Sequence, residues 1–323
     1  MKILIIGGTG FIGYHTVHEC LRRGHTLSVL ALPSPFNNHL FPAEVKTIQT
    51  NLNRMQDDRL MQVLSEHDVF VFAAGADDRT LPRAPSYPFF ENGNVKPAVR
   101  IVSLASQAGM KKGIILSSYF AHFHRLWPEK ELAKHHPYIR SRIEQEKQAF
   151  AAASGEFSVI VVELPYIFGS MPYRLPLWAP LIRYIRSPLP LFCTEGGTNM
   201  ISVQHVAEAI AGAAEHGDAG RTYLVGDENV EWTDFFNRLC AHIERRKSPR
   251  VVSNRSVKRI LKIVSLSHKI MRREGGLDPV RFVDIQTART YFDPESSRKQ
   301  LKYGRGGLDE AFGDTVRACL GYK

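Results

Sequence analysis

The chain of 323 residues lacks the features that mark secreted, membrane-spanning and zinc-binding proteins. Its four cysteines, Cys20, Cys193, Cys240 and Cys319, lie far apart and form no CxxC pair, which argues against a disulfide framework or a zinc site. No apolar run approaches the roughly 20 residues of a membrane-spanning helix, and glycines interrupt the N-terminal MKILIIGG too early for a signal peptide. We therefore expect a cytoplasmic protein with reduced thiols and no bound metal ion.

Acidic residues are absent from residues 245–273, which contain eleven Lys and Arg residues. Helical i, i+3, i+4 spacing within this segment relates Val257, Ile260, Leu261, Val264, His268 and Met271, which predicts a basic amphipathic helix. Its apolar side can pack on its own domain while the bases stay in solvent. Alternatively, the positive charge can attract an anionic membrane, an acidic protein or a phosphorylated substrate. No nucleic-acid recognition motif accompanies the charge, so we expect no specific nucleic-acid partner.

Short apolar runs alternate with helical patterns along most of the chain. Strands are predicted at residues 2–6, 26–30, 45–48, 69–73, 114–116, 159–162 and 223–225. Helices are predicted up to residue 23, after residue 53, and at 94–109, 138–153 and 205–216. Short buried strands separated by longer helices are typical of parallel crossovers. The fold class is therefore predicted as α/β, with a Rossmann-type doubly wound parallel sheet.

The texture of the sequence changes after Glu163, where prolines become frequent. We predict a nucleotide-binding Rossmann domain over residues 1–163, to which residues 201–225 return. Residues 164–200 and 226–323 are predicted to form a smaller α+β region that binds the substrate.

A glycine-rich segment, GGTGFIG, follows the first predicted strand directly and opens the first predicted helix. Gly7, Gly10 and Gly13 permit a tight turn and a close approach of the backbone to a pyrophosphate at the helix N-terminus. This context predicts a dinucleotide site. About 20 residues further on, an acidic residue would indicate NAD and an arginine NADP. The chain offers neither between Ala31 and Ser34, so the choice between NAD and NADP stays open.

The GxxGxxG spacing and the chain length resemble the extended, NAD-dependent epimerase/dehydratase-like branch of the short-chain dehydrogenase/reductase superfamily. The resemblance runs nearly from end to end, and implies cofactor contacts from five segments. Those segments are the loop with Gly7, Gly10, Phe11, Ile12 and Gly13; Asn51 and Leu52 at the adenine; Ala73, Ala74 and Gly75 beside the ribose; the helix asparagine Asn94; and Pro165, Tyr166 and Ile167 at the nicotinamide.

The candidate catalytic residues are Tyr138, Arg142 and Ser118. Tyr138 and Arg142 are four residues apart and share a helix face, as in the family's YxxxK motif, but arginine replaces the lysine. A unit charge ~4 Å from a phenol contributes about 4 kcal/mol at an effective dielectric near 20, enough to lower a tyrosine pKa by about three units. Arginine supplies this charge but cannot release a proton. Ser118 ends a predicted strand, where the family places its catalytic hydroxyl.

The residues after Ser118 are Tyr119 and Phe120 rather than a pair of acids, which argues against dehydration. The resemblance implies an NAD(P)-dependent epimerase or reductase that transfers hydride at a secondary alcohol or ketone carbon, with Tyr138 as general acid/base. The substrate would be a nucleotide sugar, or a lipophilic or carrier-bound alcohol or ketone. The alternative is a catalytically degenerate NAD(P)-binding sensor or scaffold protein. The family also implies a homodimer.

Overall fold

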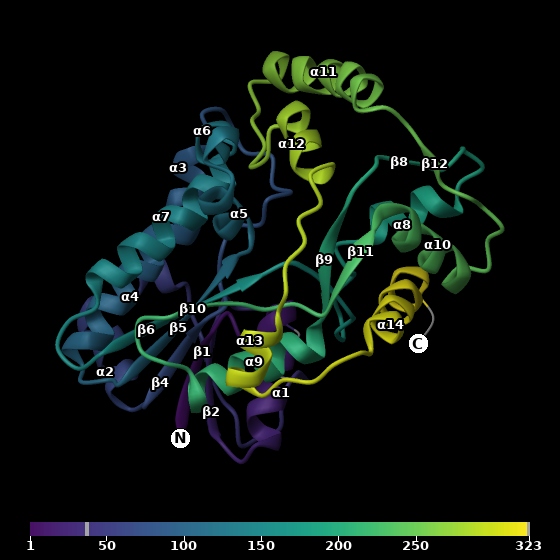
Figure 1. Ribbon diagram of the computed structural model, residues 1–323. Coiled ribbons are helices and arrows are strands. Elements are labelled where there is room, and N and C mark those ends of the chain that lie inside the picture. Colours follow the sequence, from purple (N-terminus) through teal and green to yellow (C-terminus); the bar gives the residue numbers. More distant parts are fainter. Residues whose placement is uncertain (36–38, 322–323) are drawn as a thin grey trace.

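A seven-stranded parallel sheet forms the centre of the computed structural model, which describes residues 1–35 and 39–321 (Figure 1). Its strands are β1 (Lys2–Ile6), β2 (Thr26–Ala31), β3 (Lys46–Gln49), β4 (Val69–Phe72), β5 (Lys112–Ser118), β6 (Ser158–Leu164) and β10 (Thr222–Leu224). They lie in the order β10-β6-β5-β4-β1-β2-β3, so the chain winds outward from β1 in both directions. The predicted fold class and all seven predicted strands are confirmed.

Both faces of this sheet are covered by helices. Along β1, Ile3 and Ile5 join the core on one face, whereas Leu4 and Ile6 join the core on the other. This alternation explains the uninterrupted apolar sequence of the strand, since no side faces water. One face carries α1 (Phe11–Arg22) and α9 (Val203–His216), and the other carries α2 (Asp57–Ser65), α4 (Lys96–Gln107) and α7 (Pro137–Ala152) (Figure 1).

The helix predicted at residues 94–109 begins earlier than expected. It starts as α3 (Tyr87–Phe90), continues through a π-helical turn η3 (Glu91–Val95), and then becomes α4. Pro97 lacks the backbone N–H that an α-helix would use at this point, and the wider π turn accommodates the missing hydrogen bond. Such turns recur at functional sites, and this one contains Asn94.

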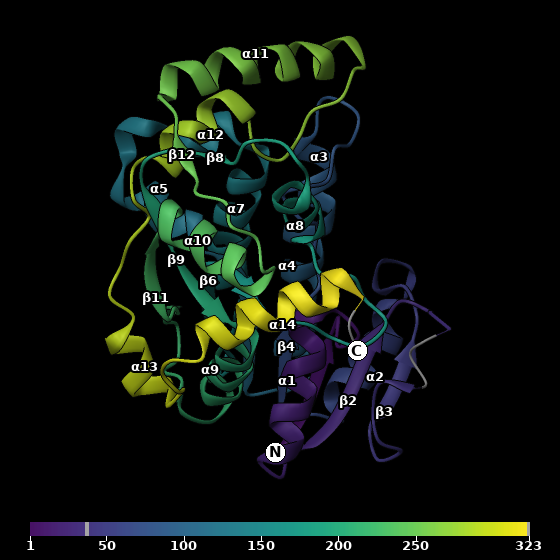
Figure 2. The same cartoon turned by 90° about the vertical axis from the view of Figure 1, so that its right-hand side faces the viewer.

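A smaller layer of short strands and helices lies beside the main sheet (Figure 2). Its strands β7 (Tyr166–Phe168), β9 (Gly197–Ser202) and β11 (Glu228–Glu231) form one sheet, and β8 (Phe192–Cys193) pairs with β12 (Arg250–Val251). Helices α8 (Ala179–Arg186), α10 (Trp232–His242) and α14 (Leu308–Leu320) cover it. Phe168, Ile182, Phe235 and Phe312 belong to a separate core in this layer.

A third group of helices stands at one end of the molecule. Helices α5 (Phe120–Leu126) and α6 (Leu132–His135) lie there with α12 (Pro279–Gln286), and α11 (Asn254–Ile270) rests on α12 (Figures 1 and 2). The predicted basic helix is therefore present as α11. The expectation that its apolar side packs on its own domain is wrong for Ile260, Val264 and Met271, which are exposed. Of the six residues of the predicted apolar side, Val257, Leu261 and His268 are partly buried.

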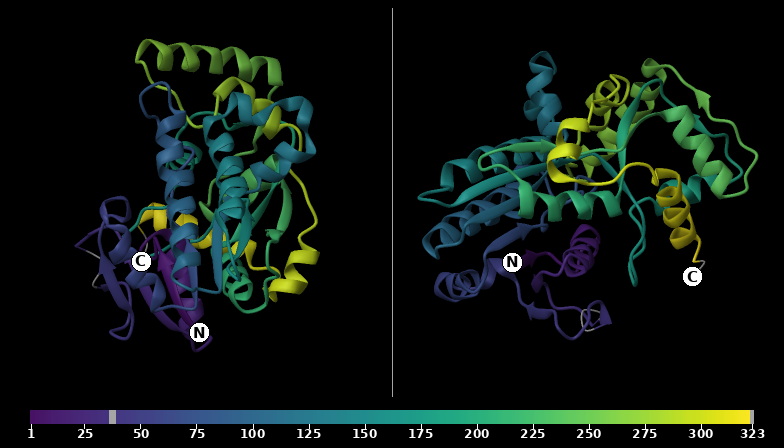
Figure 3. Two further views of the ribbon diagram at one scale, coloured as in Figure 1. Left: turned by 90° about the vertical axis from the view of Figure 1, so that its left-hand side faces the viewer. Right: turned by 60° about the horizontal axis from the view of Figure 1, so that its bottom comes forward.

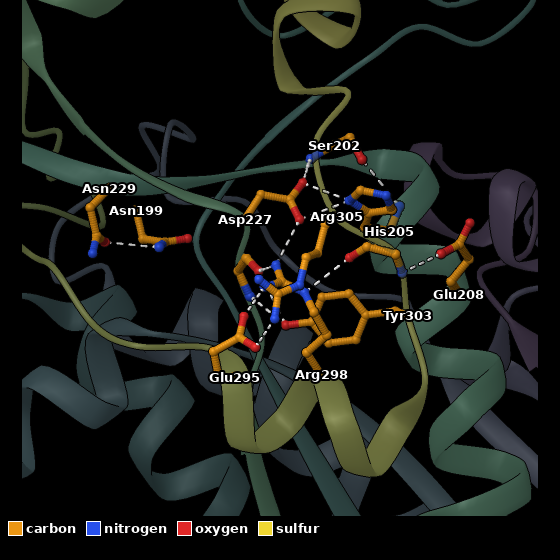
Figure 4. Close-up of polar contacts among 12 residues, drawn as sticks. Asn199, Ser202, His205, Glu208, Asp227, Asn229, Glu295, Arg298, Tyr303 and Arg305 are labelled. Carbon is orange, nitrogen blue, oxygen red and sulfur yellow. Dashed lines mark hydrogen bonds and ion pairs between the residues drawn. The ribbon is translucent and has the colours of Figure 1, made fainter.

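Helix α13 (Glu295–Leu301) is held against the main domain by a cluster of polar contacts (Figure 4). The Arg298 guanidinium donates to the carbonyl of Gly226, and His205 Nδ1 lies 2.8 Å from Asp227 Oδ1. Ser202, His205 and Asp227 lie close together, as in the catalytic triad of a hydrolase. Ser202 Oγ, however, accepts the backbone N–H of His205 and thereby caps α9, so the three residues do not form such a triad. We assign the cluster a structural role, because it fixes the C-terminal segment to α9.

Three further features of the described residues concern membrane-spanning helices, metal ligands and the cysteines. Within residues 1–35 and 39–321, no helix combines the length and hydropathy needed to cross a membrane. The same residues contain no group of three or more His, Cys, Asp or Glu side chains that could hold a metal ion. All four cysteines are free thiols, and three of them are buried.

Candidate active site

The carboxyl ends of the central strands open into one cleft of about 730 Å³. Ile6, Leu30, Phe72, Ser118 and Leu164, each from the end of a different strand, contribute to its wall. In doubly wound sheets this edge is where ligands bind, and the volume lies within the range of small-molecule sites. All the predicted site residues line this cleft except Gly13 and Asn94.

The glycine loop between β1 and α1 forms one end of the cleft. Gly7 has φ +86°, and a Cβ there would lie 2.9 Å from the backbone of Ala73 and Ala74. A Cβ at Gly13 would lie 2.3 Å from the Gly7 carbonyl oxygen, so Gly13 acts through close packing behind the loop. No side chain caps the first turn of α1 at Gly10. The N–H groups of this turn are therefore available to an anion, and the helix dipole favours a negative charge there.

Arg174 adds a positive charge to this end of the cleft. Its Nη1 lies 3.8 Å from the position that a Cβ on Gly10 would occupy, and it forms no ion pair with any described residue. No motif singles out Arg174 in the sequence, since it comes from the proline-rich segment after β7. The position fits a contact with the phosphates of a dinucleotide.

Residues expected at the adenine and its ribose line the same end. Asn51 and Leu52 face the cleft, and Asn51 Oδ1 accepts the backbone N–H of Asn53 at 3.0 Å. The end of β2 contributes Ala31 and Leu32, neither of which has a charged side chain. Neither residue at this strand end therefore carries a charge that would distinguish NAD from NADP.

Asn94 acts from behind the cleft. Its Oδ1 accepts the backbone N–H of Ala76 at 2.7 Å, and its Nδ2 donates to Ser141 Oγ at 3.0 Å. A Cβ on Gly75 would lie 2.6 Å from Asn94 Oδ1 and 3.4 Å from the Arg142 guanidinium. The absence of a side chain at Gly75 thus lets Asn94 and Arg142 approach the loop after β4, and Asn94 joins this loop to α7.

The structure brings Tyr138 and Arg142 together as the helical spacing predicts. The Arg142 guanidinium carbon lies 5.1 Å from the centre of the Tyr138 ring. Arg142 donates to Gln145 Oε1 at 3.0 Å and to the Leu116 carbonyl at 3.3 Å, while its buried Nε has no partner among the described residues. A buried donor without a partner is costly, and a ribose hydroxyl would satisfy it.

The pKa of Tyr138 is raised above its ordinary value of 10.0 in the protein alone. Burial is the largest cause, Arg142 opposes it, and the Asp78 carboxylate adds to it. Arg142 thus acts in the expected direction, but its charge is smaller in effect than the loss of solvent. Tyr138 is consequently protonated at neutral pH.

Ser118 and Tyr119 are neighbours at the end of β5, but the hydroxyl of one lies in the cleft and that of the other lies in the core. Ser118 lines the cleft and is buried, and its Oγ has only a 3.4 Å contact with the Phe120 N–H. The Tyr119 hydroxyl instead lies 2.8 Å from Thr198 Oγ1 in the core. Ser118 therefore presents a small hydroxyl in the cleft that Tyr138 also lines.

The other end of the cleft is formed by aromatic and acidic side chains that the sequence analysis missed. Pro165, Tyr166 and Ile167, the residues expected at the nicotinamide, line the cleft here, and the Tyr166 and Trp178 rings meet edge to face at 5.5 Å. Asp77, Asp78, Arg79 and Trp178 also line it. Burial, reinforced by Asp77, raises the pKa of Asp78 to about 6. These residues come from loops, for which no local pattern indicates a direction.

A buried pair of carboxylates lies directly behind Ser117. Ser117 Oγ donates to Glu146 Oε1 at 2.5 Å, and Arg125 contacts both Glu146, at 3.0 Å, and Glu163, at 2.5 Å. Burial, followed by the charge of Glu146, raises the pKa of Glu163 to about 8. The pair consequently holds a proton near neutral pH, because the buried carboxyl groups, both in contact with Arg125, disfavour each other's ionisation.

A doubly wound sheet, a glycine loop at a helix N-terminus, and a tyrosine paired with a basic residue define a nucleotide-binding oxidoreductase or epimerase. Comparison with known families agrees, since the model of the NAD dependent epimerase/dehydratase family matches residues 3–226. The chain belongs to this family. The resemblance to the extended short-chain dehydrogenase/reductase branch is thereby confirmed, and with it an NAD(P)-dependent enzyme.

Individual relatives are distant but extensive. A putative dihydroflavonol 4-reductase from Synechocystis is 22% identical over 97% of this chain and 92% of its own length. The human decarboxylating sterol-4-alpha-carboxylate 3-dehydrogenase is 24% identical over 74% of this chain and 65% of its own. The crystal structure of UDP-glucuronic acid 4-epimerase from Bacillus cereus in complex with NAD superposes with a TM-score of 0.72, at 12% identity over the full length of both chains. That similarity supports the fold.

Proposed function

We propose that this enzyme reduces a ketone, or oxidises the corresponding secondary alcohol, with Tyr138 as the general acid/base. The observation that carries the proposal is that Tyr138, Ser118 and Arg142 line the same cleft as the glycine loop, with the Arg142 guanidinium 5.1 Å from the centre of the Tyr138 ring and donating to the Leu116 carbonyl of β5.

The residues along the cleft fit a nicotinamide dinucleotide. The first turn of α1 and Arg174 would hold the phosphates, Asn51 and Leu52 the adenine, and Arg142 a ribose hydroxyl. When bound, the nicotinamide supplies or accepts the hydride. Both NAD and NADP are compatible with the residues at the end of β2.

Tyr138 moves a proton at the oxygen of the reacting carbon, and Ser118 donates a hydrogen bond to the same oxygen. Because burial raises the pKa of Tyr138, its hydroxyl is protonated at neutral pH and is prepared to donate. This state suits reduction of a ketone. Arg142 stabilises the phenolate that follows, but a relay of the proton through this position is blocked.

The substrate end favours an uncharged, lipophilic substrate over a nucleotide sugar. Its aromatic rings offer apolar contacts, and Asp77 and Asp78 would repel a diphosphate. Arg79 lies 3.9 Å from Asp77 and 4.0 Å from Asp78 and stacks over Trp178 at 5.3 Å, so its charge is partly offset by the two acids. Two relatives that match most of the chain are named for a dihydroflavonol and a sterol carboxylate, whose ring systems support the lipophilic part of this assignment, whereas a UDP-glucose 4-epimerase matches 36% of the chain.

The test compares wild type with Tyr138→Phe on a panel of lipophilic ketones and UDP-sugars, with NADH and with NADPH. We expect turnover of a ketone, and a loss of at least ~100-fold in Tyr138→Phe with unchanged cofactor binding. Near-normal turnover in the variant would contradict the role of Tyr138.

The degenerate binding protein is the competing account. It predicts no turnover by the wild type on any substrate, together with turnover created by Arg142→Lys. A cytoplasmic location and a homodimer stay predictions of the sequence.

A further inference from the structure

Helix α11 presents an apolar surface that no described part of the chain covers. None of its 17 residues is buried, whereas ten residues of α9 are. It packs on α12, where Lys258 contacts Asp284 at 2.5 Å, and Val257, Leu261 and His268 are only half-buried. The exposed fractions of Ile260, Ile263 and Ile270 are 64%, 71% and 75%, and Leu266 and Met271 are exposed beside them. By helical spacing, these residues lie on the side that faces away from α12.

The charge around this apolar surface is positive and largely uncompensated. Lys258 pairs with Asp284 at 2.5 Å, but Arg255, Arg259, Lys262 and Lys269 form no ion pair with a described residue. No acidic residue lies between residues 245 and 273. A second copy docked symmetrically on this helix would bring these bases against themselves, so the charge argues against self-association.

We propose that α11 binds peripherally to an anionic lipid bilayer. An apolar stripe flanked by Lys and Arg is the pattern by which an amphipathic helix lies in the plane of a membrane interface. The isoleucines would enter the boundary between headgroups and acyl chains, and the bases would contact anionic headgroups. The helix stands at one end of the molecule, where its outer side is not obstructed by the remaining helices (Figure 3).

Backbone hydrogen bonds connect the segment after α11 to residues near the cleft. Arg272 and Pro82 carbonyls accept the N–H groups of Ala84 and Glu274, at 3.0 and 3.1 Å. The Gly276 carbonyl accepts the N–H of Tyr138 at 2.9 Å. A bilayer bound to α11 would therefore lie on the side of the molecule that carries the substrate end of the cleft. The proposal rests on α11 alone, and does not require the proposed reaction.

The first experiment measures co-sedimentation of the full chain with vesicles of phosphatidylcholine alone, or of phosphatidylcholine mixed with phosphatidylglycerol. We expect binding only to the anionic vesicles, weakened by salt. Replacing Arg259, Lys262 and Lys269 together by glutamine should weaken binding by about 100-fold. The matched control replaces Lys111, Lys147 and Lys299, which are exposed elsewhere, and should bind like wild type.

The second experiment tests insertion of the apolar stripe. The triple variant Ile260→Asn, Ile263→Asn, Ile270→Asn should lose at least about 10-fold in affinity for anionic vesicles while its cofactor binding in solution is unchanged. An environment-sensitive fluorophore on Ile263→Cys, in a Cys319→Ser background, should shift to the blue on vesicles, unlike the same probe on Lys147→Cys.

Three results would overturn the proposal. They are equal binding by the charge variant and its control, no binding of wild type to anionic vesicles, and a vesicle-independent dimer that the isoleucine variant dissociates. The last would assign the surface to a second copy of the chain. None of them depends on turnover, so a failure here is distinct from a failure of the proposed reaction.

Discussion

The two ends of the cleft are built in different ways. At the cofactor end, the shape comes from backbone that only glycine permits, at Gly7 and Gly13, and from a helix N-terminus. At the substrate end, it comes from loop side chains such as Asp78, Arg79 and Trp178. A backbone requirement leaves a fixed spacing in the sequence, whereas converging loop side chains leave none. The comparison explains why the class of reaction is easier to infer than its substrate.

The largest expected effect in this comparison is at Gly13. In Gly13→Ala, the new Cβ would lie 2.3 Å from the Gly7 carbonyl, so the loop must shift. We expect cofactor affinity to fall by up to about 100-fold, since overpacking costs roughly 1–3 kcal/mol. Isothermal titration with NADH and NADPH measures it. The control is Gly275→Ala, whose Cβ meets nothing closer than 3.5 Å. Equal affinities in the two variants would contradict the packing role.

Arg142 contributes to both ends of the cleft, and two substitutions separate the effect of its charge from that of its shape. Arg142→Gln removes the positive charge, whereas Arg142→Lys keeps it. We expect Arg142→Gln to lower kcat/KM by about 10-fold or more, because a charged hydrogen bond is worth roughly 1.5–3 kcal/mol, and Arg142→Lys to lose less. Without the positive charge, the pKa of Tyr138 should rise further. Reduction needs the protonated phenol, so its decline at high pH should move to higher pH in Arg142→Gln. A profile that does not move would exclude electrostatic coupling.

Asp78 should act on Tyr138 in the opposite direction. Its carboxylate raises the pKa of Tyr138, so Asp78→Asn should move the same decline to lower pH, by less than about one unit. Cofactor affinity should not change, because Asp78 lies at the substrate end. The measurement is the pH profile of kcat together with a cofactor titration. A shift to higher pH would contradict the assigned geometry.

The smallest effect concerns stability and the buried Glu163. Its pKa rises from 4.5 to about 8, so the folded state holds a proton that the unfolded chain releases in this window. Wild-type stability should therefore fall between about pH 4.5 and 8. Glu163→Gln cannot titrate and should gain about 1–2 kcal/mol relative to wild type across that window. Thermal melts at pH 5 and 8 test it, with the exposed Glu156→Gln as control. A constant difference would contradict the proton that the pair holds.

The features that could be predicted from the sequence are those that depend on residue periodicity or on a restricted backbone conformation. The seven strands, the glycine loop and the shared face of Tyr138 and Arg142 each follow from local spacing, and the structure contains them. The π turn before Pro97 was missed, because helical periodicity assumes regular hydrogen bonding. Arg174 and Asp78 were missed because their positions depend on how distant loops fold back.

Amphipathic periodicity was informative for α9 and α11 in the same way, yet the two helices differ in what covers them. The apolar side of α9 is buried against α1 and the sheet, while that of α11 is exposed. Spacing indicates that an apolar side exists, but tertiary packing decides whether the chain itself covers it. The eleven bases of residues 245–273, with no acidic residue among them, were the local indication that α11 differs.

The most direct test of the account is the nucleotide that the purified protein holds. The protein is prepared without added cofactor and denatured, and the released nucleotides are identified by mass spectrometry against protein concentration. Protein that releases none is then titrated with NADH and NADPH. We predict one NAD(H) or NADP(H) per chain, either retained or bound on titration, and weaker binding in Gly13→Ala. If neither cofactor binds, the assignment of the cleft as a dinucleotide site is contradicted.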